Sequence, residues 1–266
     1  MPISESLSFQ FNNQSSTDYN IINCKIDSGL FQESFFSDRE IKEVITRKSN
    51  YLVEVKSSPR ILTITIAFTE DFDEDKLRSV KRWLSTESFS PLVFESMPDM
   101  IFYAIVIDSS ELMHNGRSGY INLQFRCKDE FIYSPQYLSP LYDLSTNPIS
   151  GTTIQFINNG DVDCQPILSL LKIDNGDISI INLSDGGKEL KFSAVLNTDG
   201  TVKIASLTAD EDLYIDSENE QIVTSIPLTY RYDNHNGIFL NMKRGVNNIL
   251  ITGTCKLQFK YQFRTL

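Results

Sequence analysis

The chain has 266 residues, of which 41% are hydrophobic and 22% charged, a composition typical of globular rather than disordered or fibrous proteins. The 35 acidic residues outnumber the 24 lysines and arginines, and the resulting net charge of −11 argues against a surface that grips nucleic acid or anionic lipid. The longest uncharged apolar run, residues 100–107, is far shorter than the roughly 20 residues of a membrane-spanning helix. Residues 1–6 have neither a basic nor an apolar stretch, so no secretion signal is expected.

In the first half of the chain, alternation of apolar and polar residues predicts half-buried strands. The segment 39–46 fits a short helix or a strand, and its pattern does not decide between them. The run 101–107 is apolar on both faces, as expected for a central strand. Two further strands are predicted, with these residues on their apolar faces: Leu62, Ile64, Ile66 and Phe68 in one, and Leu123, Phe125 and Cys127 in the other.

One segment, residues 73–85, has the periodicity of a helix. Leu77, Val80 and Leu84 form a single apolar stripe, and acidic residues precede basic ones, which suits the helix dipole. The charged run 70–76 is therefore interpreted as the start of this helix rather than as a metal site. Trp83, near the helix end, is expected in the core or an interface rather than as a platform for a sugar.

The second half is predicted to consist of short antiparallel strands. Asn-Gly or Asp-Gly pairs, which suit tight hairpin turns, occur at 115–116, 159–160, 175–176, 185–186, 199–200 and 236–237. Their spacing indicates a sandwich or barrel. Two apolar faces are predicted here: Leu190, Phe192 and Leu196 in one strand, and Cys255, Leu257, Phe259, Tyr261 and Phe263 in another.

Three prolines separate the two halves. Pro135, Pro140 and Pro148 interrupt any strand ladder, so we place a domain boundary near residues 140–150. The predicted organisation is mainly β, with domains at residues 1–140 and 141–266. Both halves are acidic, and neither is expected to bind nucleic acid.

No catalytic constellation is visible, and we assign no catalytic, cofactor-binding or metal residue. The two histidines, His114 and His235, lie beside Asn-Gly turns and are interpreted as exposed turn residues. The acidic cluster from Asp210 to Glu220 is interpreted as a solvated hairpin, with a calcium site as the alternative. The cysteines are far apart and are expected to be small core or near-core residues without disulfides: Cys24, Cys127, Cys164 and Cys255.

The order of short motifs resembles that of the distal tail proteins, called Dit, of long-tailed, non-contractile bacteriophages. In the first half these are residues 9–13 with 19–22, 37–41, 60–68, 80–84, 92–94, 97–99, 102–104, and 123–128 with 133–135. In the second half they are residues 156–160, 164–168, 213–216 and 239–249. The likeness covers about residues 5–264. Two features differ from many members of the family: residues 46–51 lack a glycine turn, and the chain has no inserted carbohydrate-binding module.

The resemblance implies an N-terminal, ring-forming β-sandwich or split-barrel-like domain with one helix, followed by a galectin-like antiparallel β-sandwich. It implies a structural hub at the virion tail tip, a hexameric ring with a channel for DNA, assembled in the host cytoplasm. The implied partners are further copies of the chain, the major tail tube protein, a tail-associated lysin-type protein, and receptor-binding or baseplate proteins. The alternative is a lectin-like protein that recognises the host. The second half lacks tryptophan, and this weighs against sugar binding.

Overall fold

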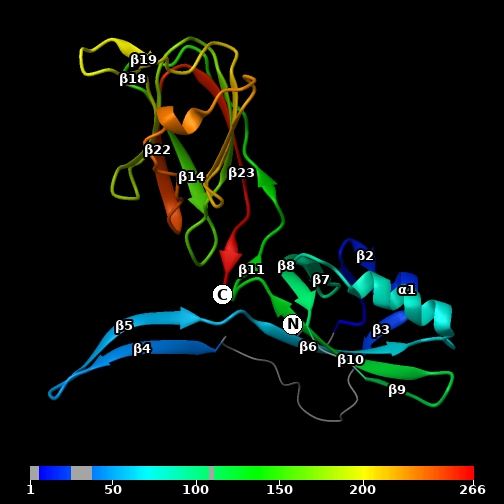
Figure 1. Cartoon of the computed structure of the whole chain (residues 1–266). Helices are drawn as coiled ribbons and strands as arrows, with labels where there is room; N and C mark the ends of the chain where they lie inside the picture. The colour runs from blue at the N-terminus through cyan, green and yellow to red at the C-terminus, as the bar shows by residue number, and fades with distance from the viewer. Residues whose placement is uncertain (1–5, 25–37, 108–110) are drawn as a thin grey trace. The chain divides into compact units, whose positions relative to one another are not determined.

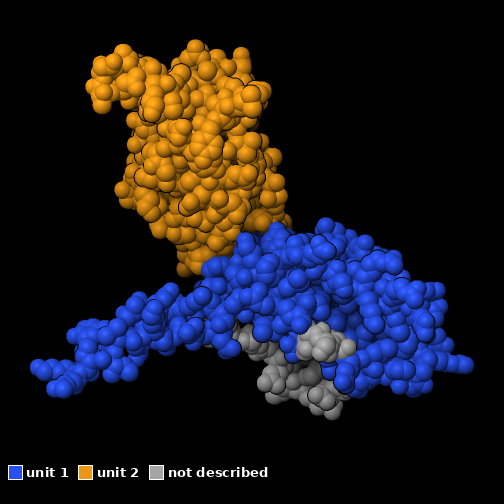
Figure 2. All heavy atoms as spheres, viewed as in Figure 1, with its two compact units in different colours: residues 1–134, 266 blue, residues 135–265 orange. Residues whose placement is uncertain are grey.

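The computed structural model describes residues 6–24, 38–107 and 111–266 (Figure 1). Residues 1–5, on which the expectation about a secretion signal largely rests, lie outside this description. The chain divides into two compact units, which Figure 2 distinguishes by colour: unit 1 comprises Met1–Ser134 with Leu266, and unit 2 comprises Pro135–Thr265. The functional domain limits of 1–140 and 141–266 stay a prediction. Both units are built mainly from strands, so the predicted fold class is confirmed.

Unit 1 is a curled antiparallel sheet with one α-helix against it. The main sheet has the order β2-β1-β7-β8-β10-β6-β3, with β9 paired to β10 and β11 paired to β8, while β4 and β5 form a separate two-stranded sheet. The elements are β1 Phe9–Phe11, β2 Gln14–Ser15, a 3-10 turn at Ser16–Tyr19, β3 Ile21–Cys24, β4 Arg39–Ile45, β5 Asn50–Ser57, β6 Ile61–Phe68, α1 Glu74–Leu84, β7 Ser90–Phe94, β8 Met97–Val106, β9 Leu112–His114, β10 Gly119–Cys127 and β11 Ile132–Tyr133.

The predicted strand faces of unit 1 are confirmed. The four apolar residues of β6 and the three of β10 are buried, and β6 and β10 pair with each other. β8 lies between β7 and β10, as expected for a central strand. Phe102 and Ala104 are fully buried on one of its faces, whereas the neighbouring Ile101, Tyr103 and Ile105 are only half-buried.

Helix α1 begins and ends close to where its periodicity predicts. The side chain of Asp73 accepts a hydrogen bond of 2.8 Å from the backbone N–H of Lys76 and so caps the helix N-terminus. Trp83 is buried, stacks on Tyr19 at a centroid distance of 4.5 Å, and donates its indole N–H to the Phe11 carbonyl at 2.9 Å. Trp83 is therefore a core residue, as predicted.

Unit 2 is an antiparallel β-sandwich. A six-stranded sheet, ordered β12-β23-β15-β20-β21 with β13 paired to β23, faces a four-stranded sheet ordered β14-β22-β16-β17. The elements are β12 Tyr137–Leu138, β13 Tyr142–Leu144, β14 Thr152–Asn158, β15 Ile167–Lys172, β16 Ile178–Asn182, β17 Lys188–Phe192, β18 Val195–Leu196, β19 Val202–Ile204, β20 Asp212–Asp216, β21 Gln221–Thr224, a 3-10 turn at Arg231–Asn234, β22 Gly245–Thr252, β23 Cys255–Tyr261 and β24 Arg264–Thr265.

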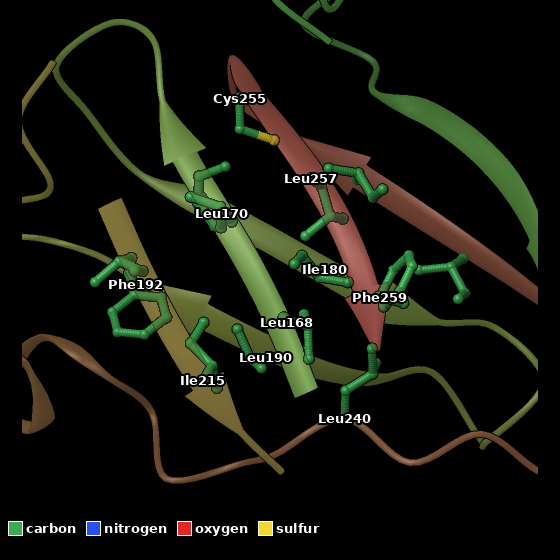
Figure 3. Close-up of a cluster of buried hydrophobic side chains, with 14 of the residues drawn as sticks. Leu168, Leu170, Ile180, Leu190, Phe192, Ile215, Leu240, Cys255, Leu257 and Phe259 are labelled. Carbon is green, nitrogen blue, oxygen red and sulfur yellow. The ribbon is translucent and has the colours of Figure 1, made fainter. Parts of the chain in front are cut away.

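The inner faces of both sheets supply one hydrophobic core (Figure 3). Leu168, Leu170 and Leu257 of the six-stranded sheet share this core with Ile180 and Phe192 of the four-stranded sheet. The alternation predicted for the last long strand is confirmed by the burial of Cys255, Leu257 and Phe259. Burial of these side chains from water supplies the main driving force for the sandwich.

Three local expectations in unit 2 are wrong. Leu196 does not continue the face of Leu190 and Phe192, because β17 ends at Phe192 and Leu196 lies exposed in the separate strand β18. Phe263 lies beyond the end of β23, so the alternating strand is shorter than predicted. Five of the six paired-turn glycines have positive φ, but Gly160 does not. A Cβ at Gly160 would approach the Arg264 carbonyl oxygen to 2.6 Å, so close backbone approach accounts for this glycine.

Candidate assembly surface

The most unusual surface of the molecule is the β4–β5 hairpin. It is a two-stranded sheet of its own, seen in Figure 2 as a slender extension of unit 1. Seven of its large apolar side chains are 47% to 77% exposed: Ile41, Val44, Ile45, Tyr51, Leu52, Val53 and Val55. Scattered exposed apolar residues are normal, but a contiguous group of this kind marks an interaction surface.

The strand register sorts these side chains onto two faces. Residues directly opposite each other in an antiparallel pair share a face. The first face, which we call the apolar face, carries the pairs Arg39–Ser57, Ile41–Val55, Glu43–Leu52 and Ile45–Asn50; the second, the charged face, carries Glu40–Lys56, Lys42–Glu54 and Val44–Tyr51. A register shift between Lys42 and Glu43, of the kind a β-bulge makes, separates the pairs on either side of it, and the apolar pairs remain on one face along the hairpin. The hairpin therefore has one apolar side and one side of paired opposite charges with an apolar tip.

The structure shows that residues 39–46, whose sequence pattern fitted either a short helix or a strand, belong to the β4–β5 hairpin. Residues 39–45 form a strand, and every residue of β4 is exposed. Periodicity could not decide because apolar residues point to both sides near the tip, where no core within the described residues receives them. The run 51–55, with three β-favouring residues in five, was the available signal for a strand with an unusual surface.

The hairpin also carries charge of the opposite sign to the rest of the chain. Residues 39–57 contain five basic residues and three acidic ones, which gives 5 − 3 = +2 in a chain of net charge −11. Arg47 and Lys48 lie in the turn between its strands. The tip is therefore basic as well as apolar.

Each unit carries at least one concave region. In unit 1, a groove of about 710 Å³ lies between α1 and the strands β8, β9 and β10. Eight of its eleven lining residues are apolar, Ser85 and Thr86 are polar, and Lys81 is charged: the lining is Leu77, Val80, Lys81, Leu84, Ser85, Thr86, Val106, Ile107, Leu112, Ile121 and Leu123. In unit 2, a shallower concavity of about 500 Å³ lies on the outer face of the six-stranded sheet, around Tyr214.

The two histidines differ in their surroundings. His114 is exposed, as predicted, and its Nδ1 accepts the backbone N–H of Gly116 at 3.1 Å. His235 makes the same turn bond to Gly237 at 3.2 Å, but its ring packs between Phe192 and Phe239, at centroid distances of 4.9 and 4.7 Å. The prediction of an exposed turn is therefore wrong for His235, and burial lowers its pKa.

The acidic cluster from Asp210 to Glu220 is a hairpin, but it is not fully solvated. Glu211 is buried and accepts two hydrogen bonds of 2.7 Å from Arg231, as well as one of 2.6 Å from Thr224. Asp216 is also buried and accepts the backbone N–H groups of Glu218 and Asn219 at 3.0 Å. Burial alone would raise the pKa of Glu211, but the hydrogen bonds and charge of Arg231 hold that pKa below its ordinary value.

The four cysteines are free thiols, three of them buried and Cys24 half-buried. Burial raises the pKa of Cys127 to about 12 and those of Cys164 and Cys255 to about 11, so these three are poor nucleophiles. In the part of the chain that the structure describes, no three His, Cys, Asp or Glu side chains are grouped to hold a metal ion. Over the same residues, no helix has the length and apolar character needed to cross a membrane.

Comparisons with protein families match the two halves of the chain separately. Residues 4–129 match a phage tail protein N-terminal domain, and residues 141–261 match a phage tail C-terminal domain. A SPbeta prophage-derived protein of Bacillus subtilis strain 168, YomH, is 31% identical over 268 residues, covering 99% of this chain and 100% of the relative.

Solved structures show the same fold at much lower sequence identity. The Dit protein of phage SPP1, described as a paradigm of the hub adsorption apparatus in phages that infect Gram-positive bacteria, is similar with a TM-score of 0.67 and 16% identity, over 96% of this chain and 98% of that one. A chain of the phage P2 baseplate in its activated conformation with calcium is similar with a TM-score of 0.52 and 9% identity, over 96% and 97%. The resemblance to distal tail proteins is confirmed. The chain belongs to the phage tail protein family that these domains define, and it has the fold of a distal tail protein.

Proposed function

We propose that this phage tail protein is the distal tail hub: a ring of identical copies, six in number, at the tip of a long non-contractile tail. The observation that carries the proposal is the β4–β5 hairpin, whose large apolar side chains are exposed. Family membership and fold support the same role. In a ring of identical copies, a second copy of the chain would be the partner that covers these exposed side chains.

The hairpin suits a head-to-tail contact rather than a twofold one. A protruding element that enters a different surface on the next copy makes a heterologous interface, and such interfaces close into rings when the rotation between copies closes. Figure 1 shows the hairpin leaving unit 1 on the side away from α1, so donor and acceptor surfaces can lie at opposite ends of the unit.

The ring would connect the tail tube protein on one side with a tail-associated lysin-type protein and receptor-binding or baseplate proteins on the other. It would be assembled in the host cytoplasm and act in the virion as a structural part, not as an enzyme. A central channel would let DNA pass. Six copies would carry 6 × −11 = −66 charges, which would repel phosphate rather than bind it.

Light scattering after size-exclusion chromatography, together with negative-stain images, tests the proposal. We expect a particle of about six chains with a central hole, and no DNA retained in a low-salt gel shift. A monomer at micromolar concentrations would contradict the ring, and retained DNA would contradict the repulsive channel.

Sugar binding is the second candidate, because the concavity of unit 2 surrounds the exposed Tyr214 with the polar side chains of Asp212, Lys256 and Gln258. An aromatic face beside hydrogen-bonding groups is the usual composition of a small-molecule site. Binding to a glycan array that is lost in Tyr214→Ala would support it. An array without signal would leave the hub as the remaining function.

A further inference from the structure

We propose that the apolar face of the β4–β5 hairpin docks into the groove between α1 and β8–β10 of the next copy, with Glu43 facing Lys81. This inference rests on the proposed ring and names its contact. The hairpin supplies four apolar side chains, Ile41, Ile45, Leu52 and Val55, around the single acidic Glu43. The groove supplies apolar walls around the single basic Lys81.

The matching composition of the two surfaces is the first argument for this occupant. Each surface is a mostly apolar patch with a charge near its centre, Glu43 on the hairpin and Lys81 in the groove, and these two charges have opposite signs. Arg39 lies on the same hairpin face, at its base. Complementary charges fix the register of an interface, while apolar burial supplies most of its free energy. The groove volume of about 710 Å³ lies in the range that receives several large side chains.

Spacing along the two elements is the second argument. Arg47 lies four residues beyond Glu43 in the hairpin, or roughly 13 Å at the rise of a strand. Glu74 lies seven residues before Lys81 in α1, or roughly 10 Å at the rise of a helix. If Glu43 lies over Lys81 with the hairpin parallel to the helix axis, the basic tip therefore reaches the acidic helix start.

That helix start is strongly acidic. Five of the six residues from 70 to 75 are Asp or Glu, and Asp71 and Glu74 are exposed. In this orientation the hairpin turn places Arg47 and Lys48 beside the acidic helix start. The basic turn and the acidic helix start then form a second contact between opposite charges, in addition to Glu43 and Lys81. A docking in the reverse direction would bring the basic turn past Arg82 at the basic end of α1 and away from the acidic start.

Charge reversal tests the contact. Glu43→Lys and Lys81→Glu should each raise the protein concentration at half-assembly roughly tenfold or more, since each places like charges together. The combined Glu43→Lys/Lys81→Glu variant should assemble close to the wild-type concentration. Glu40→Lys is the matched control, because it makes the same charge change on the charged face of the same strand. It should leave assembly within about twofold of wild type.

A cross-link gives an independent readout. Glu43 and Lys81 are both exposed, so Glu43→Cys/Lys81→Cys should fold and form oxidised ladders of covalent oligomers, while the wild type with its largely buried thiols should not. Wild-type rings with unchanged assembly in both single reversals and no ladder would overturn the docking but leave the hub intact. A wild-type chain that stays monomeric would overturn the hub and the docking together.

Discussion

Two hairpins of this molecule differ in which side chains they bury: one exposes apolar side chains and the other buries charged ones. In β4–β5, valine, isoleucine, leucine and tyrosine lie exposed. In β20–β21 and the residues beside it, Glu211 and Asp216 lie buried and fully engaged in hydrogen bonds. The second arrangement stabilises a fold, because its buried charges have partners within the chain. The apolar side chains of the first join no hydrophobic core within the described residues, which supports our proposal that this hairpin takes part in assembly.

Substitutions in the two hairpins should affect different properties: the stability of the monomer in one and its assembly in the other. Removing a partner from a buried ion pair leaves a charge without compensation, which is among the most costly single changes in a protein. Changing an exposed apolar side chain on a protruding hairpin costs the monomer little. The largest effects on folding are therefore expected at β20–β21, and the largest effects on assembly at β4–β5.

The largest expected effect on stability is that of Glu211→Ala. It leaves the buried guanidinium of Arg231 without its carboxylate and should lower the free energy of unfolding of unit 2 by about 3–5 kcal/mol. Denaturation followed by far-UV circular dichroism would show the shift. Fluorescence of the single tryptophan, Trp83 in unit 1, should change little. Asp212→Ala is the control, since Asp212 is exposed, and an equal loss there would contradict the role of the buried pair.

Asp216→Ala should have the next largest effect. The carboxylate accepts two backbone N–H groups and the side-chain amide of Asn219, and removing it should cost about 1–3 kcal/mol. Asp216→Asn retains an acceptor oxygen and should recover part of the loss. Hydrogen exchange of the β20–β21 amides would report it, and unchanged protection in the alanine variant would show that the turn does not depend on this side chain.

The pH dependence of unit 2 should include a step from His235. The folded pKa of His235 is lowered by burial, so the unfolded chain binds a proton first as the pH falls. Stability should therefore decrease as the pH falls through the ordinary histidine pKa of about 6.5. Chemical denaturation at pH 7.5 and pH 5.5 should show a smaller difference in His235→Phe than in wild type. An unchanged difference would mean that His235 is not responsible.

The smallest expected effect on stability is that of Ile45→Glu/Leu52→Glu on the apolar face near the hairpin tip. Both side chains are more than half exposed, so the free energy of unfolding of the monomer should change by about 0.5 kcal/mol or less. Denaturation at a concentration low enough to keep the chain monomeric would measure it. A loss of several kcal/mol would show that the tip belongs to the fold of unit 1, and the contrast between the two hairpins would fail.

Much of the fold could be predicted from periodicity. The strands of Leu62–Phe68 and Leu123–Cys127 and the helix of Leu77, Val80 and Leu84 each bury one face against a core, and such one-sided burial leaves a period in the sequence. The β4–β5 hairpin buries neither face within the described chain, so its sequence carries no such period.

The burial of polar side chains could not be predicted from the sequence either. Glu211 and His235 looked solvated because acidic residues and Asn-Gly turns usually are. Their burial depends on Arg231, which lies 20 residues beyond Glu211, and on Phe192, which lies 43 residues before His235. Such long-range partners leave no local pattern in a single sequence. For the same reason, the groove that faces α1 could not be anticipated, since its walls come from four separate elements.

The most direct test of the account is the mass of the particle in solution for two chains that fold equally well. Light scattering at micromolar concentration should give about six chains for wild type and one chain for Ile45→Glu/Leu52→Glu. The two proteins should have the same unfolding midpoint under monomeric conditions. Equal masses for the two proteins, whether both are rings or both are monomers, would contradict the claim that this exposed hairpin assembles the ring.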